Sequence, residues 1–277
     1  MSSSASAPAG TRLYLFHHGN MYMDARRLIQ RKEYYQRLSE RAPKDLWEPI
    51  PVLTALVVHP EGRLLFDVGA TSEWKERWRA TGHDDVVPYL ELGEEQRFEK
   101  LIPHVTSLND IDWIVVSHLH MDHCGNLRQF AGTKATVIVQ EAEYLHAFET
   151  LKPPGAGGYI SSEYDVGVRW RLLSGDLHGV MQGVDVIALH GHAPGSQGLI
   201  VRLKQTGTVV LASDAAYTLD SLGPPPIPGA TVYDHKEWVR SIERLRAYRR
   251  AEKALIVAGH DMQQLSELLF APEKYYE

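Results

Sequence analysis

The stretch that decides the fold runs from residue 115 to residue 127 and reads VVSHLHMDHCGNL. An unbroken apolar run over 113–116 leads into it, and such a run is typical of a buried strand. Directly after the run, six residues hold three histidines and a carboxylate: His118, His120, Asp122 and His123. Imidazole and carboxylate groups are ligands for zinc or another borderline divalent ion. We therefore predict a metal site where the strand ends.

The spacing of these residues favours two metal centres over one. If the chain stays extended, side chains alternate between faces, so His118, His120 and Asp122 share one face. A turn at Cys124-Gly125 would bring His123 round to a second centre. The alternative is a polar loop with solvated histidines, and four such residues in this order argue against it.

Length and composition predict a single domain over 11–277. Hydrophobic residues make up 44% and charged residues 23% of the chain, which is ordinary for a globular protein with its own core. Residues 1–10 are rich in serine and alanine and lack the basic start and apolar segment of a signal peptide, so we expect a floppy, disordered N-terminus. No apolar run is long enough to cross a membrane.

The net charge indicates which binding partners to expect, and the cysteine count indicates the cellular compartment. The formal charge of -6 argues against nucleic acid and against anionic membranes, and it favours a small neutral substrate. Cys124 is the only cysteine, so no internal disulfide can form and a cytoplasmic location is expected. We expect Cys124 to pack behind the metal loop rather than to act as a ligand or nucleophile.

The alternation of apolar and polar residues predicts a series of strands, over 11–18, 52–59, 63–67, 113–116, 136–139, 184–190, 199–203, 208–211 and 254–258. Helices are predicted over 94–101, 141–151 and 237–252, the last with a capping box of Asp234 and Glu237. Clusters of proline and glycine over 153–158 and 223–228 predict loops. This order of hairpins and helices predicts two mixed β-sheets covered by helices rather than a doubly wound parallel sheet.

Two features near the N-terminus remain open to more than one interpretation. His17 and His18 are expected to end the first strand as half-exposed wall residues rather than as metal ligands. The segment Met21–Trp47 is predicted to form a surface helix or an ordered flap. Its apolar side chains could form a wall over the site or make surface or oligomer contacts: Met21, Tyr22, Met23 and Trp47.

Ligand-type residues also follow three later strands. His192 lies in the sequence Gly-His-Ala-Pro-Gly-Ser at 191–196, Asp214 follows Ala-Ser at 212–213, and His260 follows Gly259. Each alone would be an ordinary loop residue. Four strand ends that offer the same residue types predict one composite site. His190 competes with His192 for the third position.

The whole pattern resembles the metallo-β-lactamase superfamily, through His-x-His-x-Asp-His at 118–123 and the three later residues. The resemblance implies an αββα sandwich of two mixed β-sheets flanked by helices, with a dinuclear site at one edge. It implies that one ion is bound by His118, His120 and His192, and the other by Asp122, His123 and His260. Asp214 would bridge the two ions. The Gly-His-x-Pro-Gly context selects His192 over His190, and Asp67 would support the metal loop from behind. The expected cofactors are two divalent ions, Zn²⁺ above others, which acidify water and polarise carbonyl groups.

Residues after Asp214 narrow the resemblance further. Tyr217 lies three positions beyond the bridging carboxylate, and Gln-Glu-Ala-Glu-Tyr at 140–144 follows a short strand. These features resemble the N-acyl homoserine lactone lactonases, which implies a lactone-opening, quorum-quenching hydrolase. In that reading Asp122 and Tyr217 are catalytic: Asp122 transfers a proton and Tyr217 donates a hydrogen bond to the substrate carbonyl. Tyr217 could also be a packing residue.

Other functions stay under consideration. A lactonase for another ring, such as a pyridoxine-derived lactone, would have the same build. Thioesterases of the glyoxalase type share the histidine motif but add a C-terminal helical region, whereas seventeen residues follow His260 here. A catalytically inactive binding protein would have no need of seven ligands. Met121 and Ser196 stand where relatives often have Phe and His, which leaves the acyl-chain preference open, and a homodimer also stays open.

Overall fold

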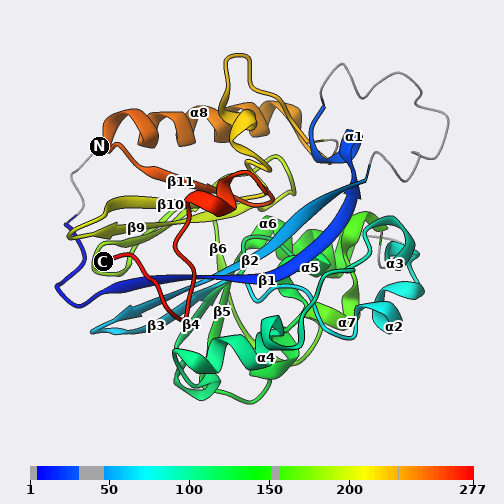
Figure 1. The fold of residues 1–277 in the computed structure, drawn as a ribbon, viewed down its shortest axis with the longest axis horizontal. Coiled ribbons are helices and arrows are strands. Elements are labelled where there is room, and N and C mark those ends of the chain that lie inside the picture. The colour runs from blue at the N-terminus through cyan, green and yellow to red at the C-terminus, as the bar shows by residue number, and fades with distance from the viewer. Residues whose placement is uncertain (1–4, 31–46, 151–155, 230) are drawn as a thin grey trace.

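The structure is a computed structural model that describes residues 5–30, 47–150, 156–229 and 231–277. Two β-sheets pack face to face, and helices cover their outer faces (Figure 1). The predicted αββα sandwich is therefore confirmed.

The first sheet, among the described residues, has six strands in sequence order: β1 (Arg12–Asp24), β2 (Trp47–His59), β3 (Gly62–Phe66), β4 (Trp113–Val115), β5 (Thr136–Gln140) and β6 (Arg169–Leu173). Strands β1 to β3 are antiparallel neighbours, and β3 to β6 run parallel. The parallel strands alternate with helical connections, as parallel pairing requires.

The second sheet of the described chain has the order β11 (Leu255–Ala258), β10 (Gly207–Ser213), β9 (Gln197–Leu203), β8 (Val184–Ala188) and β7 (Leu177–Met181). Only β10 and β11 pair in parallel, and the other neighbours are antiparallel. Both sheets are thus mixed, as predicted.

Alternating side chains build three apolar layers. One face of each sheet meets the other in the central layer, which includes Val57, Val115, Val201 and Leu211. The opposite face of the first sheet packs against helical segments through Phe98, Phe130 and Tyr164. Burial of such side chains contributes about 1.5–3 kcal/mol each, so these layers hold the strand ends in fixed positions.

Eight α-helical segments are described: α1 (Ala25–Leu28), α2 (Trp74–Arg79), α3 (His83–Val86), α4 (Phe98–Leu101), α5 (Met121–Cys124), α6 (Glu141–Leu145), α7 (Ser161–Tyr164) and α8 (His235–Ala251). Helix α8 lies along the second sheet (Figure 1), on which it buries Trp238, Ile242 and Leu245. Asp234 caps its N-terminus by accepting hydrogen bonds from the backbone N–H groups of Lys236 and Glu237.

The N-terminal third departs from the sequence predictions. Strand β1 does not end at His17 and His18 but continues to Asp24, and its pairing with β2 resumes at Asn20 after an irregularity that follows His17. Gly19 permits this passage: its φ is +92°, and an added Cβ would lie 1.9 Å from the backbone oxygen of Glu91. His18 is buried rather than half-exposed, and its ring bonds to Gln96 O and Thr54 Oγ1.

The predicted surface helix or flap over 21–47 is also wrong at both described ends. Met21 and Met23 belong to β1 and are buried with Trp74 and Trp78, and Trp47 begins β2. Among the described residues of this segment, only the single turn α1 is helical. Residues 31–46 lie outside the described part.

Other predicted boundaries shift as well. The predicted helix over 94–101 is split between a 3₁₀ turn and α4, and the one over 141–151 continues from α6 as a π-helical segment over 146–150. The expectation of a floppy segment over 1–10 does not hold at Ala7, which is buried and donates a hydrogen bond from its N–H to Arg202 O. Residues 1–4 lie outside the described part. None of the helices in the described ranges has the length and apolar character needed to cross a membrane.

Candidate metal centre

Seven predicted ligands converge at one edge of the two sheets. They come from the ends of β4, β8, β10 and β11, because these strands deliver their following loops to the same side of the sandwich: His118, His120, Asp122, His123, His192, Asp214 and His260. One expectation about them was wrong. The chain does not stay extended to Asp122, because β4 ends at Val115 and Asp122 and His123 lie on α5.

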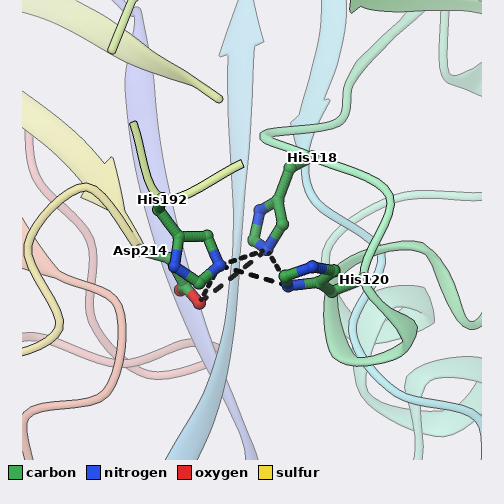
Figure 2. A group of neighbouring side chains, drawn as sticks. All are labelled: His118, His120, His192 and Asp214. Atoms are coloured by element: carbon green, nitrogen blue, oxygen red, sulfur yellow. Dashed lines mark hydrogen bonds and ion pairs between the residues drawn. The ribbon is translucent and has the colours of Figure 1, made fainter. Parts of the chain in front are cut away.

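The first donor group contains three imidazoles (Figure 2). The Nε2 atom of His118, the Nδ1 atom of His120 and the Nε2 atom of His192 form a triangle with sides of 2.9, 3.2 and 3.1 Å. Ligand nitrogens about 2.0–2.1 Å from a tetrahedral zinc ion lie roughly 3.3 Å apart. The triangle is thus close in size to one face of such a coordination sphere.

The second donor group contains Asp122, His123 and His260. Oδ2 of Asp122 lies 3.5 Å from the Nε2 atom of each of the two histidines. Asp214 lies between the two groups. Its Oδ1 is 3.2 Å from Nε2 of both His123 and His260, while its Oδ2 is 3.3 Å from Nε2 of His192. One carboxylate therefore presents one oxygen to each group.

The donor set fits metal ions by its own chemistry. Nε2 of His123 and Oδ1 of Asp214 are buried and make no hydrogen bond within the described residues, although they face each other. Buried polar atoms normally have a hydrogen-bond partner, so two such atoms directed at one point indicate a ligand position. The other donors are nitrogen and oxygen atoms of the types that divalent ions bind.

Hydrogen bonds to the second ring nitrogen orient four of the five histidines. Nδ1 of His192 faces the backbone oxygen of Thr231 at 2.9 Å, and Nδ1 of His260 faces that of Pro51 at 3.0 Å. Nδ1 of His118 lies 3.0 Å from the hydroxyl of Ser117. A carbonyl partner places the proton on Nδ1 and leaves the lone pair on Nε2, directed at the cluster.

The fourth of these histidines is oriented by Asp67. Its carboxylate accepts from Nδ1 of His123 at 2.9 Å and from the backbone N–H and hydroxyl of Ser117 at 2.6 and 2.9 Å. Asp67 is 2% exposed and has a positive φ of 58°, an uncommon conformation that directs it at the metal loop. The support expected from Asp67 is therefore confirmed.

The pKa values of the histidines shift in opposite directions in the two donor groups. Burial lowers the pKa of His118, His120 and His192, so these rings are neutral and have free lone pairs. Burial also disfavours the charged forms in the second group, but there the carboxylates outweigh it and raise the pKa of His123 and His260. Burial raises the pKa of Asp122, but the charges of His123 and His260 outweigh it and lower that pKa to about 2.

Tyr217 lies against the cluster. It is 5% exposed, and its ring centroid is 5.3 Å from that of His192 and 5.2 Å from that of His260. Burial first, and then the charge of Asp214, raise the pKa of its hydroxyl well above the usual value. The phenol is therefore protonated and can donate a hydrogen bond.

A match to a family model accompanies this geometry. Residues 47–260 match the model of the metallo-β-lactamase superfamily, which is more than half of the chain. The chain belongs to the metallo-β-lactamase superfamily.

Three similar proteins are described as N-acyl homoserine lactonases or lactone hydrolases. The N-acyl homoserine lactonase AttM of Rhizobium radiobacter is 36% identical over 239 residues, which cover 82% of this chain and 88% of that protein. AiiA, an N-acyl homoserine lactonase of Bacillus thuringiensis subsp. kurstaki, is 30% identical, with 81% and 86% covered. A solved N-acyl homoserine lactone hydrolase that holds N-hexanoyl-L-homoserine at its catalytic metal centre has a TM-score of 0.80 and 26% identity over 99% of this chain and all of its own.

Some neighbouring residues stay outside the donor groups of this metallo-β-lactamase fold. His192 belongs to the first donor group, as its sequence context predicted, whereas His190 belongs to neither group. Cys124 is fully buried in the core, and burial raises the pKa of its thiol, so its predicted packing role is confirmed. Met121 is buried in the same apolar cluster as Met21, and the hydroxyl of Ser196 accepts a hydrogen bond from the backbone N–H of Ala193.

Glu143 lies in the Gln-Glu-Ala-Glu-Tyr sequence noted for its family resemblance, but its role at the site was not predicted. Its fully buried carboxylate accepts from the backbone N–H of Leu119 and of Gly195, each at 2.9 Å, and from the hydroxyl of Tyr159 at 2.8 Å. It thus ties the loop of His118 and His120 to the loop of His192. The available signal was its place just after β5, the parallel neighbour of β4, whose carboxyl end lies at the same edge.

Proposed function

We propose that this protein is a dinuclear metal-dependent hydrolase that opens the lactone ring of N-acyl homoserine lactones. The observation that carries the proposal is Asp214, which directs one oxygen at each of two donor groups while Tyr217 lies beside it. A shared carboxylate of this kind suits a pair of ions rather than one.

Zinc is the proposed ion at both positions. Three nitrogens in a triangle near 3 Å support it at the first position, and two nitrogens with a carboxylate support it at the second. Divalent ions held by these donors supply an acidified water and a polarised carbonyl.

The chain's own residues would perform the remaining steps. The Tyr217 hydroxyl is a protonated donor at the edge of the cluster, where it can bind the lactone carbonyl as negative charge develops on it. Asp122 is ionised and has a side chain that is 12% exposed, so it can accept a proton and return it to the leaving oxygen of the ring. The hydrogen bonds of Asp67 and Glu143 would keep the donors in place during turnover.

The substrate class is supported by the described activity of the relatives. AttM and AiiA are N-acyl homoserine lactonases, and the solved hydrolase holds the ring-opened product of such a lactone. Destruction of this signal would make the protein a quorum-quenching enzyme. The predictions of a cytoplasmic location and of a possible homodimer stay predictions.

Hydrolysis assays with zinc-loaded protein would test the function. The panel contains N-hexanoyl-L-homoserine lactone, a pyridoxine-derived lactone, a glutathione thioester and a phosphodiester. We expect kcat/KM for the homoserine lactone to exceed the others by at least about a hundredfold, roughly 2.7 kcal/mol of differential transition-state binding. Preference for the other lactone or for the thioester would replace this proposal with the corresponding alternative.

A further inference from the structure

Among the described residues, two cavities of several hundred cubic ångströms lie beside the donor cluster, one next to each group. The first, here called the aromatic cavity, has a volume of about 470 Å³ and includes His120, His192, His146, Tyr159, Val232 and Tyr233 in its wall. The second, here called the acidic cavity, has a volume of about 340 Å³ and reaches His260. A substrate held at the cluster can therefore extend in either of two directions.

The side chains of the two walls differ in charge. The acidic cavity is lined by four carboxylate residues, with no lysine or arginine among its described lining residues: Glu48, Asp220, Asp261 and Glu267. An apolar acyl chain that covered those carboxylates would remove them from water, which is unfavourable. The described wall of the aromatic cavity contains no carboxylate and no lysine or arginine. The aromatic cavity is thus the better environment for an acyl chain.

A row of rings leads through the aromatic cavity from solvent to a metal-ligand residue. The ring of Tyr159 contacts that of His120 with centroids 4.6 Å apart, and His146 contacts Tyr159 at 5.2 Å. Tyr233 contacts His146 at 5.4 Å and is 63% exposed. Its backbone N–H bonds to His192 O, which fixes this exposed ring at the cavity wall.

His146 is a polar residue of this row that belongs to neither donor group. It is half-buried on the π-helical segment after α6, and such segments often occur at functional sites. Among the described residues its ring nitrogens make no hydrogen bond, while two aromatic rings pack on it. A plain hydrocarbon chain packed on this imidazole would remove its nitrogens from water without giving them a hydrogen-bond partner, which costs free energy. The position of His146 therefore favours a ligand that carries a polar group at that depth of the cavity.

We propose that His146 is a specificity-determining residue that donates a hydrogen bond to a carbonyl at the third carbon of the acyl chain. The inference rests on the proposed function. In an N-acyl homoserine lactone such a carbonyl lies about 6 Å from the lactone carbonyl, by ordinary bond lengths. His146 and His120 both pack on the ring of Tyr159 and line the same cavity, so a chain of this length that leaves the cluster through that cavity passes His146. Burial lowers the pKa of His146, so the ring is neutral and one nitrogen carries a proton to donate.

The experiment compares two substrates that differ only at that carbon, N-(3-oxohexanoyl)- and N-hexanoyl-L-homoserine lactone. His146→Phe keeps an aromatic ring in the wall and removes the N–H donor. We expect it to lower kcat/KM for the 3-oxo substrate roughly three- to tenfold, mainly through KM, and to leave the unsubstituted substrate within about twofold. His104→Phe, a change at an exposed histidine outside both cavities, is the matched control and should alter neither value.

The outcomes separate this inference from the proposed function. Equal loss on both substrates, or no loss on either, in a variant with normal metal content would overturn the role of His146 while the lactonase function stands. A zinc-loaded wild-type protein that hydrolyses neither lactone would overturn the proposed function, and the role of His146 with it.

Discussion

Tyr217 is closely packed beside the donor groups. Its ring lies between His192 and His260, and Gly229 approaches so closely that an added Cβ would lie 2.7 Å from Cδ2 of the tyrosine. This packing restricts the direction of the hydroxyl. A fixed donor stabilises developing charge better than a mobile one, because no reorganisation is needed during the reaction.

Tyr217→Phe should separate catalysis from packing. The variant keeps the ring and both donor groups but loses the hydroxyl. We expect it to retain its metal and to lower kcat/KM for a homoserine lactone by roughly one to two orders of magnitude, since metal ions stabilise part of the same charge. Steady-state kinetics with parallel metal analysis would measure this.

Tyr275→Phe is the matched control, because that ring packs on Tyr14 away from the donor groups. Its activity should be unchanged. Turnover of Tyr217→Phe within about twofold of wild type, with normal metal content, would make Tyr217 a packing residue only.

At the scale of elements, α7 contacts α2 through a buried carboxylate. Glu163 on α7 is 1% exposed, its Oε1 has no hydrogen bond within the described residues, and its Oε2 lies 3.5 Å from Arg77 on α2. Burial raises its pKa to about 7, although Arg77 opposes the shift. Between the usual carboxyl pKa near 4.3 and about 7, the folded protein therefore holds a proton that the unfolded chain has released.

Glu163→Gln should remove this pH dependence. As pH rises through that range the wild-type protein loses stability at this residue, up to about 4 kcal/mol at roughly 1.4 kcal/mol per pKa unit. The variant should thus be more stable than wild type at pH ~8 and similar at pH ~4.5. Urea unfolding of the chelator-treated proteins at both pH values would measure the difference.

An exposed residue of α2 provides the control. Glu76→Gln removes a negative charge from α2, the helix of Arg77, but the carboxylate that it removes is exposed and not buried. It should follow the wild-type curve at both pH values. A constant difference between Glu163→Gln and wild type across this range would show that Glu163 has an ordinary pKa.

At the scale of the molecule, the donor groups join the two sheets. His118, His120, Asp122 and His123 follow a strand of the first sheet, while His192, Asp214 and His260 follow strands of the second. Any ion bound by both sets therefore cross-links the two layers. A metal ion that binds the folded state and not the unfolded chain stabilises the folded state by mass action.

The metal prediction is two ions per chain and a higher unfolding temperature when they are bound. Asp214→Asn should lower both the metal content and the turnover, because it removes the charge shared by the two groups. Elemental analysis and thermal unfolding before and after chelation would measure these effects. Asp110→Asn, at an exposed acidic residue, is the control.

A firm ceiling of one ion in carefully loaded wild-type protein would contradict the bridging role. So would an Asp214→Asn variant with unchanged metal content and rate.

Local sequence sufficed for the existence of most strands and for the residue types that follow them. Apolar runs such as 113–116 and 184–188 form strands because their side chains favour burial on a pleated surface, and each is followed at once by ligand-type residues. The choice of His192 over His190 and the support from Asp67 came from the family resemblance, and the geometry agrees with both.

The tertiary structure decided what depends on residues far apart in the chain. β1 passes His17 and His18 only because Gly19 meets the backbone of Glu91, a contact across 72 positions that no local pattern contains. The three hydrogen bonds of Glu143 join three separate segments, and the two oxygens of Asp214 face donors from both sheets. The sequence determines the type and spacing of each residue, whereas the partners of a residue are fixed only when sheet packing brings distant segments into contact. The candidate donor residues could therefore be predicted, but the position of Asp214 between the two groups and the adjoining cavities could not.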